Sequence, residues 1–133
     1  MLADPDTRAA ISDLVAETYR RMSTPGSDPG ALMSHPDFAV AGSGLGELAY
    51  ERSDVRAMAD AVASWAFTWS VDKVTVWREA DVAWAQILGS VRTRRNGVED
   101  DVPYWTTGVF AHDADSWHWR YWGGAEPQAE PRV

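Results

Sequence analysis

Few residues of this chain have side chains suited to acid–base or metal chemistry, and they are scattered. The densest group is His112, Asp113, Asp115 and His118. Its spacing matches no standard zinc site, and aspartate is ordinary in a hairpin turn. The chain has no cysteine, which excludes disulfides, thiolate catalysis and cysteine-ligated zinc. We therefore predict no metal and no cofactor.

A glycine-rich stretch at residues 42–47 reads Gly-Ser-Gly-Leu-Gly-Glu. It follows a predicted strand, but no βαβ unit surrounds it and the dinucleotide-binding pattern is incomplete. We therefore interpret it as a loop rather than a nucleotide site.

Composition narrows the class of protein. The chain has 133 residues, a formal net charge of −8 and 45% hydrophobic residues, which suits one globular domain. The negative charge disfavours nucleic acid as a partner. No apolar run approaches the ~18 residues of a membrane span, and the first residues show no secretory signal pattern. Since cysteine is absent as well, we expect a cytoplasmic protein.

Helical signals dominate the first half of the chain. Asp4 and Pro5 are a cap and a first helical residue, and an apolar stripe from Ile11 to Met22 follows. Asp28-Pro29 repeats this signal before a short second helix. A third helix is predicted to begin at a Ser53 cap, with an apolar stripe that comprises Val55, Met58, Ala59, Val62, Trp65 and Ala66.

Strand signals dominate the second half. A short strand is predicted at 38–41, and four longer ones at about 69–77, 82–94, 102–111 and 117–122. Asn96-Gly97 is a strong hairpin signal. Helices first and strands later indicate an α+β fold, with the helices packed on a curved, mainly antiparallel sheet that encloses a pocket. We expect a single domain over 1–124 and a flexible tail over 125–133.

This order of elements resembles the NTF2-like superfamily and its SnoaL-like, ketosteroid-isomerase-like branch. The likeness rests on Phe38–Glu47 before a helix, on Asp81-Val-Ala-Trp84 at the start of a long strand, and on Trp117 in the last strand. The family implied includes isomerases, cyclases, hydrolases, dehydratases and binding modules without catalysis, so the fold alone does not give the function.

The resemblance allows a residue-by-residue comparison with the ketosteroid isomerases, which use a carboxylate base, a tyrosine and a protonated aspartate. The tyrosine corresponds to Tyr19. The carboxylate base corresponds to Gly42, which has no side chain. The protonated aspartate corresponds to Thr107, which has only a neutral hydroxyl. Isomerisation by that machinery is therefore not predicted.

The resemblance also places Thr107 toward the pocket, and alternation along the strands then predicts its other wall residues. The predicted ligand-binding set is Tyr19, Trp65, Trp69, Gln86, Leu88, Ser90, Trp105, Thr107, Val109, Arg120 and Trp122. Arg120 is a candidate clamp for an anion, because its planar fork suits two oxygens. The alternative for Arg120 is an ion pair with Glu17 or Asp13, and the alternative for Tyr19 is a core residue.

Three functions follow from this set. The first is a pocket protein for a small apolar or aromatic molecule, including an anionic one. The second is a cyclase- or isomerase-type enzyme that polarises its substrate with Tyr19 and Arg120. The third is a non-catalytic dimeric interaction module whose tryptophans fill the pocket. All eight tryptophans lie between Trp65 and Trp122. Packing in the core or at a dimer interface is the ordinary explanation for them, and contact with a flat ligand is the alternative.

A homodimer is expected through the outer face of the sheet. Val82–Val91 is apolar on both faces, and alternation predicts that Trp117, Trp119 and Tyr121 point away from the pocket. Monomers seldom expose a patch of that size.

Overall fold

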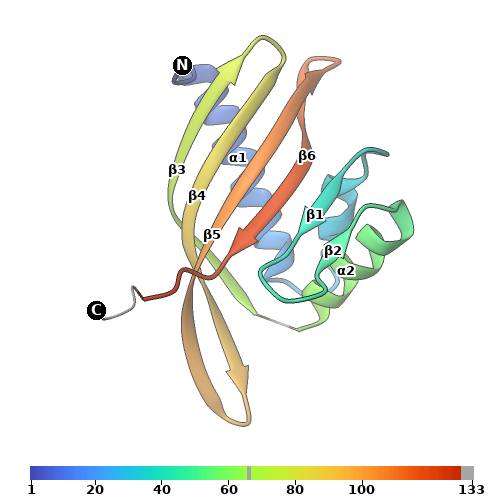
Figure 1. Ribbon diagram of the computed structural model, residues 1–133, viewed down its shortest axis with the longest axis vertical. Helices are drawn as coiled ribbons and strands as arrows, with labels where there is room; N and C mark the ends of the chain where they lie inside the picture. Colours follow the sequence, from blue (N-terminus) through green and yellow to red (C-terminus); the bar gives the residue numbers. More distant parts are fainter. Residues whose placement is uncertain (66, 130–133) are drawn as a thin grey trace.

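The computed structural model describes residues 1–65 and 67–129, apart from the side chain of Arg95. Helix α1 (Pro5–Met22) and the short 3-10 helix η1 (Pro29–Met33) come first, and helix α2 (Arg52–Ser64) follows two short strands. The sheet contains β1 (Ala39–Ala41), β2 (Leu48–Ala49), β3 (Thr68–Glu79), β4 (Val82–Arg95), β5 (Val98–Asp113) and β6 (Ser116–Ala125). The α+β architecture of the sequence prediction is confirmed (Figure 1).

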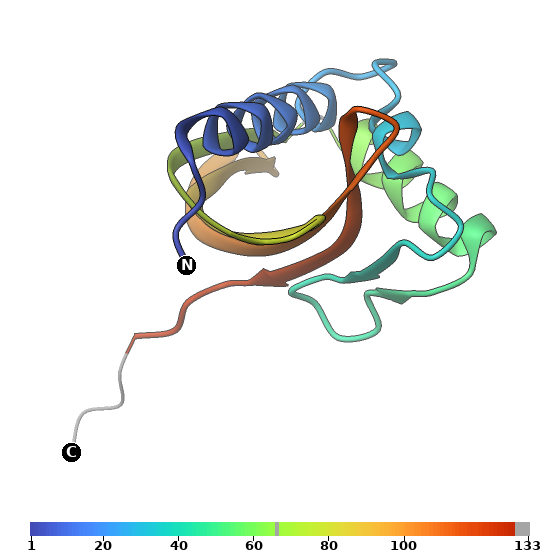
Figure 2. The same cartoon turned by 90° about the horizontal axis from the view of Figure 1, so that it is seen from above.

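The strands form one sheet in the order β2-β1-β6-β5-β4-β3. All neighbours are antiparallel except β1 and β6, which pair in parallel. Seen from above, the sheet curls around one side of α1, while η1 and α2 lie next to β1 and β6 (Figure 2). The concave side is thus covered by α1 at one end and by α2 with η1 at the other.

Local signals explain most of the element boundaries. Asp4 caps α1 as predicted, since its Oδ1 accepts a hydrogen bond of 2.9 Å from the backbone N–H of Thr7. Asn96 and Gly97 both have positive φ at the β4–β5 turn, as the hairpin signal requires. The predicted Ser53 cap is wrong, because α2 already begins at Arg52 after Glu51.

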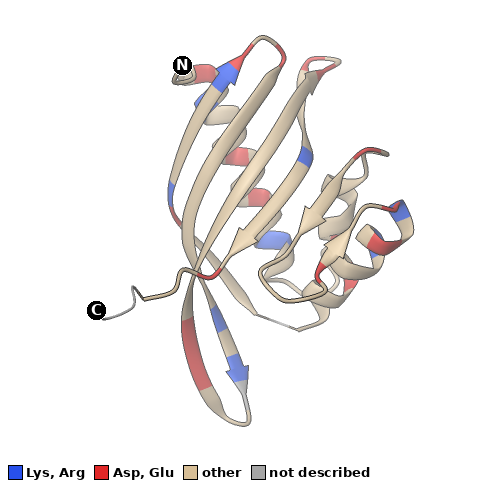
Figure 3. Cartoon of the chain, viewed as in Figure 1, with Lys and Arg blue, Asp and Glu red and all other residues tan. Residues whose placement is uncertain are grey.

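Strands β5 and β6 are longer than predicted. Strand β5 begins at Val98, so the end of the β4–β5 hairpin projects beyond the sheet with arginines on one strand and acids on the other (Figures 1 and 3). Strand β6 continues through Ala125. The predicted flexible tail therefore begins within a strand, and residues 130–133 of it lie outside the described part, as does Ala66 of the predicted helical stripe.

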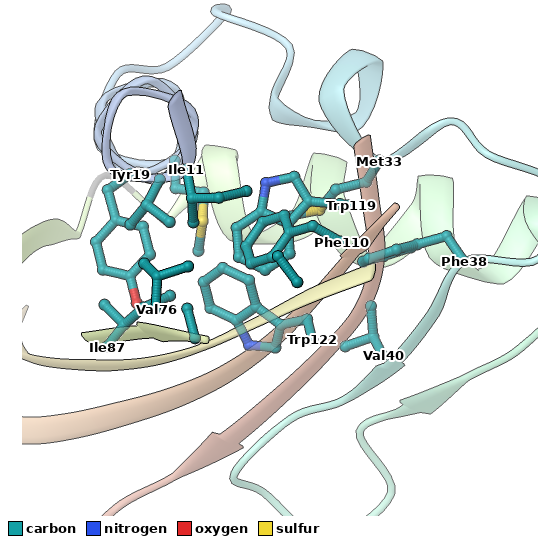
Figure 4. Packing of buried hydrophobic residues seen from close by; sticks show 14 of the residues in the cluster. Ile11, Tyr19, Met33, Phe38, Val40, Val76, Ile87, Phe110, Trp119 and Trp122 are labelled. Carbon is teal, nitrogen blue, oxygen red and sulfur yellow. The ribbon is translucent and has the colours of Figure 1, made fainter. Parts of the chain in front are cut away.

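The core lies between α1 and the concave face. Trp119, Phe110 and Ile11 are fully buried there (Figure 4). The partners of the large rings on β5 are small, because Phe110 stands opposite Ala83 and Tyr104 opposite Gly89 on β4. The small residues of β4 leave room for the rings of β5, and α1 packs mainly on β3 beside them.

Two consecutive residues of α1 form buried hydrogen bonds to the sheet. The Trp119 indole Nε1 donates to Thr18 Oγ1 at 3.0 Å, and the Tyr19 hydroxyl lies 2.7 Å from Thr106 Oγ1. Thr18 Oγ1 also donates to the Leu14 carbonyl at 2.7 Å. These bonds fix the position of α1 along the sheet. Among the described helices, none is long and apolar enough to cross a membrane.

The Thr18 bond leads to a first prediction. Thr18→Val keeps the shape but leaves the buried Trp119 N–H without an acceptor, so the free energy of unfolding should fall by about 1–3 kcal/mol. Thr24→Val, in the exposed turn just after the same helix, is the matched control, with an expected change within about 0.5 kcal/mol. Urea denaturation measures both, and equal small effects would contradict the role given to Thr18.

Candidate functional site

A cavity of about 280 Å³ lies between α2 and the part of the sheet that α1 does not cover. Its walls come from the end of α1, η1, the β1–β2 loop, α2 with the residues that follow it, strands β1 and β3–β6, and the residue after β6. The lining residues are Met22, Pro29, Met33, Val40, Gly42, Ser43, Glu47, Val55, Met58, Ala59, Val62, Trp65, Phe67, Trp69, Val91, Thr93, Asp100, Val102, Tyr104, Trp122 and Glu126.

Helix α2 supplies one wall with its apolar stripe. The five described residues of the predicted stripe all line the cavity: Val55, Met58, Ala59, Val62 and Trp65. The helix packs mainly on η1, β2 and the end of α1, and so it stands away from the central strands. The face that would otherwise bury itself on the sheet borders the empty space instead.

Aromatic rings form the opposite wall. Trp69 packs edge-on against Tyr104 with ring centroids 4.9 Å apart, and against Trp122 at 6.1 Å. Trp65 and Phe67, which follow α2, form a second pair between the two walls, with ring centroids 5.4 Å apart. These side chains carry large apolar faces and a few polar tips, as small-molecule sites commonly do.

Glu47 brings a carboxylate to the cavity through the β1–β2 loop. The backbone N–H of Gly42 donates to the Glu47 carbonyl at 2.7 Å, and the Glu47 N–H donates to the Gly44 carbonyl at 3.1 Å. A Cβ at Gly42 or at Gly44 would collide with the Glu47 carboxylate. The carboxylate thus lies in the space where a side chain at Gly42 would begin, and the two glycines make room for it.

Tyr104 places a neutral hydroxyl in the same corner. Burial is the main cause that raises the pKa of Tyr104, and the charges of Glu47 and Glu126 raise it further, against the hydrogen bonds with Trp122 and Ser43. Glu126 is held nearby, because Ser43 Oγ donates to its Oε2 at 2.7 Å. A phenol that stays protonated can donate a hydrogen bond, while Glu47 can accept a proton.

Three of the predicted ligand-binding residues line the cavity, namely Trp65, Trp69 and Trp122. Tyr19 lies behind this wall, with its ring 5.5 Å from Trp122 and 5.8 Å from Trp69. Its hydroxyl is bonded to Thr106, and burial raises its pKa. Tyr19 is thus a core residue that supports the wall, which was the alternative interpretation of this residue.

The predicted facing of β4 and β5 is wrong by one residue. Val91 and Tyr104 line the cavity, so alternation puts Gln86, Leu88, Ser90, Trp105, Thr107 and Val109 on the outer face. Thr107 donates to Gln86 there at 3.1 Å, and Leu88, Ser90 and Trp105 line a separate shallow depression beside Lys73. The inward hydroxyl on β5 belongs to Thr106.

Arg120 also lies away from the cavity. Its Nη2 is 3.6 Å from Asp37 Oδ2, in the turn before β1. The expected partners Glu17 and Asp13 are not used, since Glu17 is bound by Arg20 and Arg21. An ion pair, rather than a clamp inside the pocket, is therefore what the geometry gives for Arg120.

Trp117 and Trp119 were expected to point away from the pocket, and this is wrong. Trp119 is fully buried in the core, and Trp117 packs against it with Arg78 4.9 Å from its ring. The cause is a β-bulge in β6, where Val109 pairs with Tyr121 but Phe110 pairs with Trp119. Arg120 is the extra residue, so Trp119 and Trp122 face the same side.

Four titratable residues line the cavity that were not predicted as site residues: Glu47, Asp100, Tyr104 and Glu126. Tyr104 was not predicted because the wrong face of β5 was expected to point inward. Glu47 carried a usable signal, because it ends a glycine-rich loop directly after a strand, but only folding brings it back beside Gly42. The His112 group forms no site among the described residues: His112 packs on Trp117, and His118 Nε2 lies 3.0 Å from Ser116 Oγ.

Residues 13–124 match the SnoaL-like domain family, and the chain belongs to that family. No protein of curated function shows significant sequence similarity to it. A candidate dehydratase of the NTF2-like family from Streptomyces avermitilis has the same fold, with a TM-score of 0.82, 14% identity, and coverage of 95% of this chain and 100% of that one.

Two further solved structures share the fold. A candidate calcium/calmodulin-dependent protein kinase II association domain from Xanthomonas campestris has a TM-score of 0.76 and 16% identity, with 98% of this chain and 91% of that chain covered. A candidate ketosteroid isomerase from Shewanella frigidimarina has a TM-score of 0.72 and 12% identity, with 87% and 94% covered. At such identities the likeness concerns the fold alone.

Proposed function

We propose that this protein binds a small apolar or aromatic molecule in the cavity between α2 and the sheet. The observation that carries the proposal is the cavity of about 280 Å³ with its walls of aromatic and aliphatic side chains. An apolar cavity of about 150 Å³ holds benzene, so this one has room for a molecule of one or two rings. Its aromatic walls would report binding directly, because Trp65, Trp69 and Trp122 are fluorescent.

A cavity-filling variant tests this proposal. Val62→Phe adds a ring on the α2 wall, and we expect it to weaken binding of aromatic probes such as indole and naphthalene by tenfold or more, since the space is then occupied. Ala57→Phe, on the exposed face of the same helix, is the control and should change binding less than twofold. Tryptophan fluorescence titration measures both. Probes that leave the fluorescence of the unmodified protein unchanged would contradict the proposal.

A second function, proton transfer, is favoured by the position of Glu47. A carboxylate in the space beside Gly42 restores a base at the position where the ketosteroid-isomerase comparison found none. Tyr104 supplies a neutral donor in the same corner, so an acid–base pair borders the cavity. We therefore propose Glu47 and Tyr104, rather than Tyr19 and Arg120, for a cyclase- or isomerase-type reaction.

The base can be tested without the natural substrate. 5-Nitrobenzisoxazole opens when a base removes its ring proton, and it fits the size of the cavity. We expect the protein to accelerate this opening and Glu47→Gln to lose at least ~100-fold of that rate, as removal of a general base does. Glu51→Gln, at the exposed start of α2, is the control and should retain the rate. Equal rates in the two variants would contradict the role of Glu47.

We also propose that the outer face of the sheet forms a homodimer, as the sequence predicted. Val82 and Trp105 are each 44% exposed there, next to Trp84 and Leu88 on the same face. Light scattering should give a dimeric mass, and Leu88→Glu should give a monomer with unchanged circular dichroism. A monomeric mass for the unmodified protein would contradict the dimer.

The cytoplasmic location also stays a prediction, which the absence of cysteine supports.

A further inference from the structure

Carboxylates are the charged groups of the cavity. Glu47, Asp100 and Glu126 line it, while none of the lysine and arginine side chains that the structure describes does so. These acids are also free of ion pairs within the described part of the chain, where the arginines pair with acids elsewhere, such as Asp28, Asp37 and Asp101. A ligand with a negative charge would meet three like charges and no compensating one.

The aromatic wall also favours a positively charged ligand. Phe67, Trp69, Tyr104 and Trp122 come from three strands and a loop to surround one space. Faces of such rings attract a cation within about 6 Å, and an aromatic cage is a common way to bind quaternary ammonium groups. The rings and the carboxylates are independent features of the site, and both would stabilise positive charge.

The positions of the acids suit a ligand that carries one charged group on an otherwise apolar molecule. Glu47 is half-buried beside Gly42, whereas Asp100 and Glu126 are exposed at the opening. The methionines of the interior, Met22, Met33 and Met58, offer an apolar and adaptable surface to the rest of the molecule. A cation near Glu47 would thus lie between the acidic opening and the aromatic wall.

We infer that the ligand of this cavity is an organic cation, an alkyl- or arylammonium compound with one or two rings. The inference rests on the proposed binding function and goes beyond it by giving the ligand a charge. It also replaces the anionic ligand expected from Arg120, because that guanidinium is paired with Asp37 outside the cavity.

Three probes of similar shape separate charge from size. Phenyltrimethylammonium has a positively charged nitrogen where tert-butylbenzene has a neutral carbon, and the two otherwise have the same shape. Benzoate carries a negative charge. By fluorescence titration we expect the cation to bind about tenfold tighter than its neutral isostere, and benzoate to bind weakest. Added salt should weaken binding of the cation and leave the affinity for the neutral probe unchanged.

Matched variants locate the charge effect. Glu47→Gln and Asp100→Asn should each reduce the affinity for the cation about threefold or more. The affinity for tert-butylbenzene should change less than about twofold. Asp101→Asn is the control, since Asp101 is the next residue on β5 but faces Arg92 on the outer side. It should change neither probe, and circular dichroism checks that each variant is folded.

The outcomes distinguish the two proposals. Equal or tighter binding of tert-butylbenzene or benzoate would overturn the charge inference and leave the binding function intact. Equal losses in Asp100→Asn and Asp101→Asn would also overturn it, because net charge rather than the site would then be responsible. No binding of any of the probes would overturn the binding function itself for molecules of this size.

Discussion

The bulge at Arg120 determines how the concave side of this protein is filled. Without the extra residue, strict alternation along β6 would send Trp119 and Trp122 to opposite faces. With it, Trp119 enters the core and donates to Thr18 of α1, while Trp122 becomes part of the cavity wall. One irregularity in one strand therefore supplies both the anchor of the main helix and an aromatic surface of the site.

The cavity exists because the two helices differ in their distance from the sheet. Helix α1 packs chiefly on β3 and also contacts β6, and large buried rings such as Phe110 and Trp119 fill the space between this helix and the sheet. Helix α2 packs on η1 and β2 instead, and its apolar stripe remains opposite the aromatic wall. An apolar space of this kind stays open only where the surrounding elements are held by other contacts, and here η1 and the β1–β2 pair hold α2.

The chemistry of the site depends on the absence of side chains as much as on their presence. Gly42 and Gly44 leave the room that the Glu47 carboxylate occupies. A residue just before β2 therefore places its carboxylate beside the end of β1, where Gly42 has no side chain. The same corner holds Tyr104, whose pKa is raised by burial. This arrangement allows acid–base chemistry and attraction of a cation, because both need a carboxylate beside an apolar wall.

Local sequence signals determined the elements of this protein. The Asp4 cap, the stripe of α2 and the Asn96-Gly97 turn each depend on neighbours within a few residues, and the order of elements with Phe38–Glu47 gave the family and the α+β fold. Tertiary structure alone decided which strand face points inward. Strand β4 is apolar on both faces, so alternation has two solutions, and the packing of the sheet around α1 selects one. It also decided the partner of Arg120 and the return of Glu47 to Gly42, because both depend on a bulge and a loop closure that join residues without a fixed spacing in the chain.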